Sequence, residues 1–255
     1  MNRLRTILAP IMFGVAFLLM WEFVVLAFHI KPYLLPKPSA IWGQFHTNFH
    51  SISKASGVSG LNALVGLLAG TGLGLLLAFV ASRFRLLSEL LSPLAIAVAA
   101  MPIIVLVAIF NNLFAITSEL PRRLMVTVAV FFVVFVNVTK GLTQSNATQL
   151  ELLRSYGASE SAVIRKVRVP NALGYLFVAL KQAAPLAVVT AFVAEYFGGN
   201  QNGLGSKITS AIATSKDTAG WAYVLAACLV GVLFYVLSTV LEYVAMPWAR
   251  HRRST

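Results

Sequence analysis

Charged residues are scarce in this chain, and acidic residues are the scarcest of them. Only 11% of the 255 residues are charged, with 8 Asp and Glu against 20 Lys and Arg, whereas 58% are hydrophobic. An ordinary soluble domain carries about 25% charge. The composition therefore excludes a typical soluble enzyme or binding domain, and it raises the question of how many helices cross a bilayer.

Metal ligands and cysteines are also few. The single cysteine, Cys228, lies in an apolar run, which excludes an intramolecular disulfide and a thiolate metal site. The four histidines (His29, His46, His50 and His251) are not spaced with acidic partners as a metal site requires. The sequence also lacks a Gly-x-x-x-x-Gly-Lys-Ser/Thr phosphate loop. We therefore expect no metal site and no site for nucleotide hydrolysis in this chain.

The net charge of +12 does not indicate a nucleic-acid partner. The basic residues form short clusters between long apolar runs, which leaves no soluble face for a phosphate backbone. Basic loops beside apolar spans are instead typical of membrane proteins.

Six apolar segments reach or approach the length of about 20 residues that crosses the hydrocarbon core. They are residues 7–30, 60–81, 90–110, 124–139, 173–197 and 221–248. The first is long enough to span and is not followed by a small-residue cleavage site, so we interpret it as a retained helix. These segments predict an all-α, polytopic membrane protein with about six transmembrane helices, in which residues 1–255 form one transmembrane domain.

The distribution of Lys and Arg predicts the orientation. A cytoplasmic N-terminus places 12 basic residues inside and 7 outside, with Lys181 within a span. This bias favours both termini in the cytoplasm. It also places residues 140–170 on the cytoplasmic side.

Two further patterns predict packing. Gly66, Gly70 and Gly74 form a small-xxx-small face, for which we favour packing within one subunit over a dimer seam. Between the first two spans, Pro38 begins a stretch in which Trp42, Phe45 and Phe49 share one helical face. This spacing predicts a short helix at the membrane surface.

The predicted cytoplasmic loop has a helical pattern that a simple connector would lack. Leu150, Leu153 and Tyr156 have helical spacing, and Gly157 follows where a left-handed or tightly packed residue is needed. Ser159 begins a plausible N-cap region for a second short helix. We expect Pro170 to end that helix and to start the next span.

This loop resembles the EAA loop of permease subunits of binding-protein-dependent ABC importers. The residues that fit the pattern, without a gap, are Glu151, Gly157, Ala158, Val167, Val169 and Pro170. Leu152 and Leu153 depart from it, since alanines are usual there. Trp21-Glu22, residues 34–40, Met101-Pro102 and Ala194-Glu195 with Gly203-Leu204-Gly205 resemble the nitrate/sulfonate/taurine branch. The Trp-Phe-Gly usual after Pro102 is replaced by residues 110–114.

The resemblance implies a type I ABC importer permease fold in a bacterial inner membrane. It implies a coupling helix that docks on a cytoplasmic ATPase dimer, which binds ATP and Mg²⁺. By the same resemblance, this chain would have no catalytic site and no bound cofactor of its own. It also implies a second permease copy, identical or related, and an extracytoplasmic solute-binding protein. The substrate would be a small anion such as nitrate, a sulfonate or taurine; the alternative is a pyrimidine, riboflavin or another vitamin precursor. The residues it assigns to ATPase coupling are Glu151, Tyr156, Gly157, Ala158, Val167 and Pro170.

Polar residues within spans are candidates for the translocation path. The polar candidates are Asn111, Asn112, Lys181, Gln182 and Glu195, and Pro102 is a further candidate beside them. Alternatives remain for several of them: Lys181 could form a structural ion pair, Asn111 and Asn112 could cap a helix end, and Glu195 could order the glycine-rich turn that follows.

Arg122 and Arg123 are expected to be exposed outside, where they would contact the binding protein or anchor the chain at the interface. A different class of function, an ion-coupled carrier or a channel, is disfavoured. The chain shows no clear internal repeat, and carboxylates within its spans are few.

Overall fold

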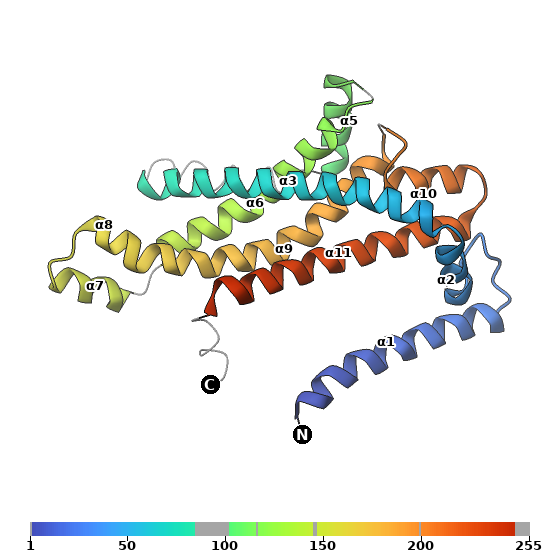
Figure 1. Ribbon diagram of the computed structural model, residues 1–255, viewed down its shortest axis with the longest axis horizontal. Coiled ribbons are helices and arrows are strands. Elements are labelled where there is room, and N and C mark those ends of the chain that lie inside the picture. The colour runs from blue at the N-terminus through green and yellow to red at the C-terminus, as the bar shows by residue number, and fades with distance from the viewer. Residues whose placement is uncertain (1, 85–101, 116, 145–146, 199, 248–255) are drawn as a thin grey trace.

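The computed structural model describes residues 2–84, 102–115, 117–144, 147–198 and 200–247, and every regular element in these ranges is helical (Figure 1). The elements are α1 (Asn2–Ala27), α2 (Pro38–Thr47), α3 (Phe49–Arg83), α5 (Ile103–Leu113), α6 (Leu120–Thr143), α7 (Ala147–Ser155), α8 (Glu160–Val163), the π-helix η1 (Ile164–Arg168), α9 (Val169–Tyr196), α10 (Leu204–Ala213) and α11 (Asp217–Ala245).

Five stretches of helix are long and apolar enough to cross a membrane. They are Leu8–Ala27, Phe49–Arg83, Leu120–Thr143, Glu160–Tyr196 and Asp217–Ala245. Five of the predicted spans are therefore confirmed. The other predicted span, residues 90–110, lies largely outside the described residues, and its final part forms the shorter apolar helix α5.

The glycine face of α3 packs against α6 within the same chain, as predicted. A Cβ at Gly66 would lie 2.4 Å from the Cβ of Val126, and one at Gly74 would lie 2.9 Å from the Cβ of Val134. At Gly70 the nearest atom would be the carbonyl oxygen of Thr127, at 2.6 Å. Only hydrogen side chains permit this approach of the two backbones.

The same contacts show that α3 and α6 are parallel, because residue numbers rise together along the seam from Gly66 and Val126 to Gly74 and Val134. The C-terminal end of α3 and the N-terminal end of α6 therefore lie at opposite ends of this seam.

Helix α9 completes the core and runs antiparallel to α6. Near one end Asn171 donates to the carbonyl of Gly141 at 2.7 Å, and towards the other Ala194 packs with Met125. Helix α11 covers α9, and α7 with α8 lie at the end of the long axis opposite α2 and α10 (Figure 1). We refer to these two ends as the α7 end and the α10 end.

Helix α1 lies apart from this core (Figure 1). Most of its described side chains are exposed, and its contacts are mainly at its C-terminal part. There Glu22 accepts hydrogen bonds from the backbone N–H of Ser39 at 3.0 Å and from its hydroxyl at 2.7 Å. A short helix that begins at Pro38 is confirmed as α2, on which the rings of Trp42 and Phe45 stack with centroids 5.5 Å apart. The helix is shorter than predicted, because Phe49 is the first residue of α3.

Candidate functional site

The α7 end carries a helix with no buried side chain. Helix α7 has no buried residue, and Glu151 on it is exposed. Leu152 is 56% exposed and Tyr156 is 80% exposed, and their spacing of four puts them on one face. A free apolar and aromatic face on a short helix is suited to binding another protein.

A glycine in the left-handed region ends α7. Gly157 has a φ of +67°, and the N–H of Ala158 donates to the carbonyl of Leu153 at 3.0 Å while that of Gly157 donates to Arg154 at 2.9 Å. This pair of bonds is the Schellman arrangement. A Cβ at Gly157 would meet nothing within 4 Å, so the backbone conformation and not packing requires glycine here. The predicted left-handed residue is confirmed.

The helix after this turn begins at Glu160, as the sequence predicts, and then continues further than predicted. The carbonyl of Ser159 accepts from the N–H groups of Ala162 at 2.9 Å and Val163 at 3.0 Å, although its hydroxyl contacts Ser161 and does not cap the helix.

The prediction that Pro170 ends this helix is wrong, because residues Glu160–Tyr196 form one continuous helical stretch. The π-helix η1 precedes Pro170. At its end the N–H of Val169 donates to the carbonyl of Ile164, five residues back. Wider spacing of this kind accommodates a residue without an N–H. Val167 and Pro170 therefore lie on the rigid element that joins α8 to the span. We call residues 147–170 the coupling segment.

The α10 end holds a buried polar cluster around Arg122. Its guanidinium pairs with Glu119 at 2.7 Å, donates to the side-chain carbonyl of Asn202 at 2.9 Å and donates to the backbone carbonyl of Asn200. Asn62 of α3 donates to Glu119 at 2.9 Å. We call these residues, together with Arg123, the Arg122 cluster.

The expectation that both arginines are exposed is wrong for Arg122, whose side chain is 2% exposed. Arg123 is half-buried, and its Nε donates to the side-chain carbonyl of Asn62 at 3.0 Å. Arg122 finds partners in its own chain through Nη1 and Nη2, while its Nε is buried without a hydrogen-bond partner among the described residues. Burying a guanidinium with no partners at all would be costly.

Opposing effects set the ionisation of Glu119. Burial alone would raise the pKa of this carboxyl, but hydrogen bonds from Asn202 and Asn62, together with Arg122, outweigh burial and hold the pKa below its usual value. Glu119 is therefore an anion at neutral pH.

Glu195 orders the glycine-rich turn, which is the alternative that the sequence offered. Its side chain is 0% exposed and accepts from the hydroxyl of Ser59 at 2.6 Å and from the N–H of Gly205 at 3.2 Å. A Cβ at residue 203 would lie 2.2 Å from the Glu195 carboxyl, so only glycine fits at this position.

The other path candidates differ in exposure. Lys181 forms an ion pair with Glu242 of α11 at 2.8 Å, the alternative that the sequence left open for it. Its neighbour Gln182 is exposed in the middle of α9. Asn112 and Pro102 are also exposed, whereas Asn111 lies against the turn after α9, where a Cβ at Gly198 would be 2.8 Å from its amide nitrogen.

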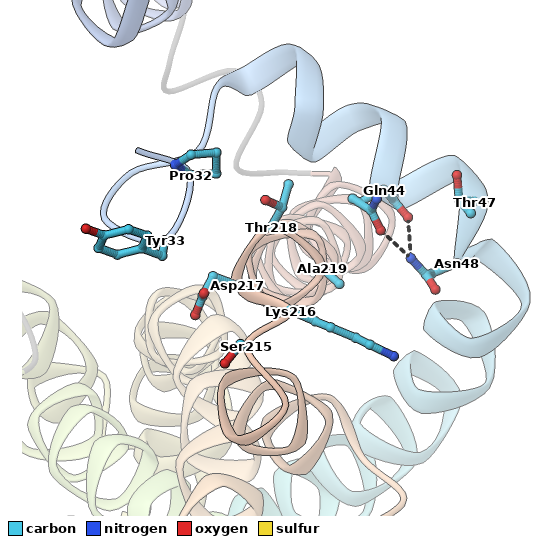
Figure 2. Close-up of a pocket in the computed structure, with 10 residues that line it drawn as sticks. All are labelled: Pro32, Tyr33, Gln44, Thr47, Asn48, Ser215, Lys216, Asp217, Thr218 and Ala219. Atoms are coloured by element: carbon cyan, nitrogen blue, oxygen red, sulfur yellow. Dashed lines mark hydrogen bonds between the residues drawn. The ribbon is translucent and has the colours of Figure 1, made fainter. Parts of the chain in front are cut away.

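A pocket of about 600 Å³ opens at the α10 end, and sequence reasoning did not identify it (Figure 2). The loop after α1, the end of α2 and the turn between α10 and α11 surround it, with Tyr33, Lys216 and Asp217 among its lining residues. The turn depends on Ser215 at a φ of +54°, a conformation that no sequence signal marks for a serine. The pocket presents both charge signs to a partner.

Comparisons with known proteins find similar permeases. The chain is 29% identical to the formylaminopyrimidine transport permease protein ThiX of Halalkalibacterium halodurans, over 98% of this chain and 99% of that protein. It is 25% identical to a protein assigned as the aliphatic sulfonates transport permease SsuC of Bacillus subtilis, over 75% of this chain and 68% of that protein.

Among solved structures, an inward-facing MetNI methionine ABC transporter chain is similar, with 19% identity and a TM-score of 0.48 over 75% of this chain and 94% of that one. Residues 70–251 match the family described as the binding-protein-dependent transport system inner membrane component. The chain belongs to this family, as a multi-pass inner-membrane permease subunit of an ABC importer and not as an enzyme.

Proposed function

We propose that the coupling segment docks on a cytoplasmic ATPase and transmits its movement to the membrane-spanning part of this chain. The observation that carries the proposal is the exposure of α7. None of its side chains is buried, and Leu152 and the adjoining Tyr156 are exposed. The continuous helix Glu160–Tyr196 gives a mechanical reason, since it runs from the coupling segment through the whole span. A displacement of α7 and α8 would move this helix as one body.

This proposal also gives the orientation. The α7 end faces the cytoplasm, and the α10 end faces outward. Helix α1 runs towards the α10 end and α11 runs away from it (Figure 1), so both termini are cytoplasmic in this arrangement. The excess of basic residues on the α7 side supports the same assignment.

The translocation path lies between this chain and a second permease copy. An exposed amide in the middle of a span is costly against lipid, and such residues face a water-filled cavity or a partner. Gln182 satisfies this description. Pro102 and Asn112, which are exposed near the two ends of α5, are further candidates. Lys181 is less suited to the path because Glu242 already neutralises it.

For the substrate, we favour a small aminopyrimidine-like solute over an anion. An unpaired Lys181 would have supplied a positive charge to attract an anion in the path. Its ion pair with Glu242 neutralises this charge. The similarity to the formylaminopyrimidine permease extends over 98% of the chain, whereas the sulfonate permease aligns with 75%. An aliphatic sulfonate is the second candidate.

A solute-binding protein would dock at the α10 end, on the pocket in Figure 2. Lys216 is exposed there and Asp217 is half-buried, so charges of both signs are available to a partner. We propose this surface in place of Arg122 as the contact with the binding protein, because the Arg122 guanidinium is enclosed by its own chain. Arg123, which is half-buried beside Asn62, remains a second candidate.

Uptake by purified components tests the coupling proposal. The full-length permease is reconstituted into proteoliposomes with its ATPase and binding protein, and ATP-dependent uptake is measured for the wild type, Gly157→Asp, Glu151→Ala and the control Gly72→Ala. A Cβ at Gly72 meets nothing within 4 Å, so this control keeps uptake. The two coupling variants lose uptake or fail to assemble with the ATPase. Normal assembly and uptake by both variants would refute the proposal.

The same vesicles test the substrate. Labelled formylaminopyrimidine should be taken up, and excess unlabelled formylaminopyrimidine should reduce this uptake, whereas an excess of an aliphatic sulfonate should not. Uptake of a labelled aliphatic sulfonate alone would favour the second candidate.

A further inference from the structure

A small basic pocket lies beside the coupling segment, where three spanning helices end. It has a volume of about 220 Å³ and is lined by the end of α3, the end of α6 and the α8–η1 turn. Its lining combines the guanidinium groups of Arg83 and Arg168 with an apolar floor that includes Phe79 and Leu142. We propose that this basic pocket binds the phosphate group of an anionic phospholipid.

The two arginines have unused capacity for an anion. Arg168 pairs with Glu160 through Nη2 at 3.3 Å, but its Nε is buried and has no hydrogen-bond partner among the described residues. Arg83 forms no ion pair with any residue that the structure describes. A buried donor without an acceptor is costly, and a phosphate oxygen would satisfy it.

The remaining polar groups do not supply the attraction. The hydroxyl of Ser82 already donates to the carbonyl of Phe79 at 2.8 Å. The C-terminal end of α3 carries the negative pole of the helix dipole, which disfavours an anion. Recognition therefore depends on the two guanidinium groups, and Glu160 competes for one of them.

The position of the pocket favours a lipid over a free anion. Arg83 is the last residue of α3 and Leu142 lies one residue before the end of α6, so the pocket is at the level where the apolar spans end. Phospholipid phosphates lie at this level. From the pocket, Phe79 and Leu76 continue along α3 with exposed fractions of 45% and 60%, which gives an acyl chain an apolar surface to follow.

The size of the pocket is consistent with a headgroup. Sites for whole drug-sized molecules usually measure about 300 to 1,000 Å³, and this pocket is smaller. Basic pockets between spanning helices on the cytoplasmic side are known to bind anionic headgroups. The orientation comes from the proposed function, but the binding experiment below does not depend on ATPase coupling.

Native mass spectrometry of the full-length permease in detergent tests the proposal. Dioctanoyl phosphatidylglycerol and dioctanoyl phosphatidylcholine are titrated against the wild type, Arg83→Gln, the double variant Arg83→Gln/Arg168→Gln and the control Arg165→Gln. Arg165 is exposed on the same π-turn and does not line the pocket. We expect each pocket arginine to contribute about fivefold to phosphatidylglycerol binding, and the double variant to lose about twentyfold.

Two further variants sharpen the result. Arg83→Lys/Arg168→Lys keeps the charge and should retain most of the preference for phosphatidylglycerol. Glu160→Gln removes the competing carboxylate and should strengthen binding. If the double variant does not fold, Arg83→Gln alone tests the site, because Arg83 has no ion pair to lose among the described residues.

Three outcomes would overturn the proposal. The first is equal binding of the two lipids by the wild type. The second is a loss in Arg165→Gln as large as that in the double variant. The third is displacement of the lipid by inorganic phosphate at equal concentration, which would identify a site for a soluble anion and not for a phospholipid.

Discussion

The two ends of the molecule use similar polar residues in opposite ways. At the α10 end, Arg122 and Glu195 are 2% and 0% exposed, and each is held by partners from other elements of the chain. At the α7 end, Glu151 and Tyr156 project from a helix with no buried residue. The comparison shows that a charged residue near a span contributes to stability or to partner binding according to whether its own chain satisfies it.

The largest effect that separates the two ends is expected from removing an arginine. Arg122→Ala removes a buried guanidinium and leaves the half-buried Glu119 without its cation, and breaking a buried pair costs about 3 to 5 kcal/mol. Arg154→Ala, at an exposed site on α7, should change stability by less than about 0.5 kcal/mol. Thermal unfolding of the detergent-purified variants measures both. Equal destabilisation would mean that the two ends do not differ as described.

A smaller effect is expected at the seam between α3 and α6. Gly70→Ala places a Cβ 2.6 Å from the carbonyl oxygen of Thr127, and the shift of backbone needed to relieve it should cost about 1 to 3 kcal/mol. Gly72 lies two residues further along α3, where a Cβ would face open space. Gly72→Ala should therefore leave the stability of the protein unchanged or raise it slightly, since alanine favours helix. The same melting experiment compares them. A stable Gly70→Ala protein would contradict the packing of this seam.

The smallest effect is a pH dependence from Glu119. Its pKa is lowered in the folded state, so its stabilisation is fully present above its unfolded value of about 4.3 and is lost as pH falls through the folded value. Glu119 is partly exposed, so we expect less than about 1 kcal/mol. Glu119→Gln should lose less stability than the wild type below about pH 5, in melts recorded from pH 7 downward. An identical loss in both proteins would exclude this contribution.

Local patterns in the sequence were sufficient for much of the fold. The apolar runs predicted five of the spans that the structure describes, because about 20 apolar residues in a row have few alternatives to a membrane helix. The spacing of Gly66, Gly70 and Gly74 predicted a close helix seam. The place of Gly157 between two helical stretches, which is also a local signal, predicted a left-handed or a tightly packed residue, and the structure shows the left-handed one.

The partners of the buried polar residues could not be identified from the sequence, because they lie far away along the chain. Asn202 meets Arg122 across 80 residues, and Glu242 meets Lys181 across 61 residues. Nothing near either basic residue marks it as satisfied. The continuation of the helix through Pro170 was missed for another reason: a π-turn is rare, and the sequence offers no signal for it.

The roles of the coupling residues, the path residues and the binding-protein surface remain predictions. The most direct test of the contrast between the two ends is the amount of ATPase that co-purifies with the Tyr156→Ala permease, measured beside its melting temperature. Tyr156 is 80% exposed, so the account predicts an unchanged melting temperature and a clear loss of bound ATPase. Full ATPase binding by Tyr156→Ala, or a loss of binding that merely follows a loss of stability, would contradict it.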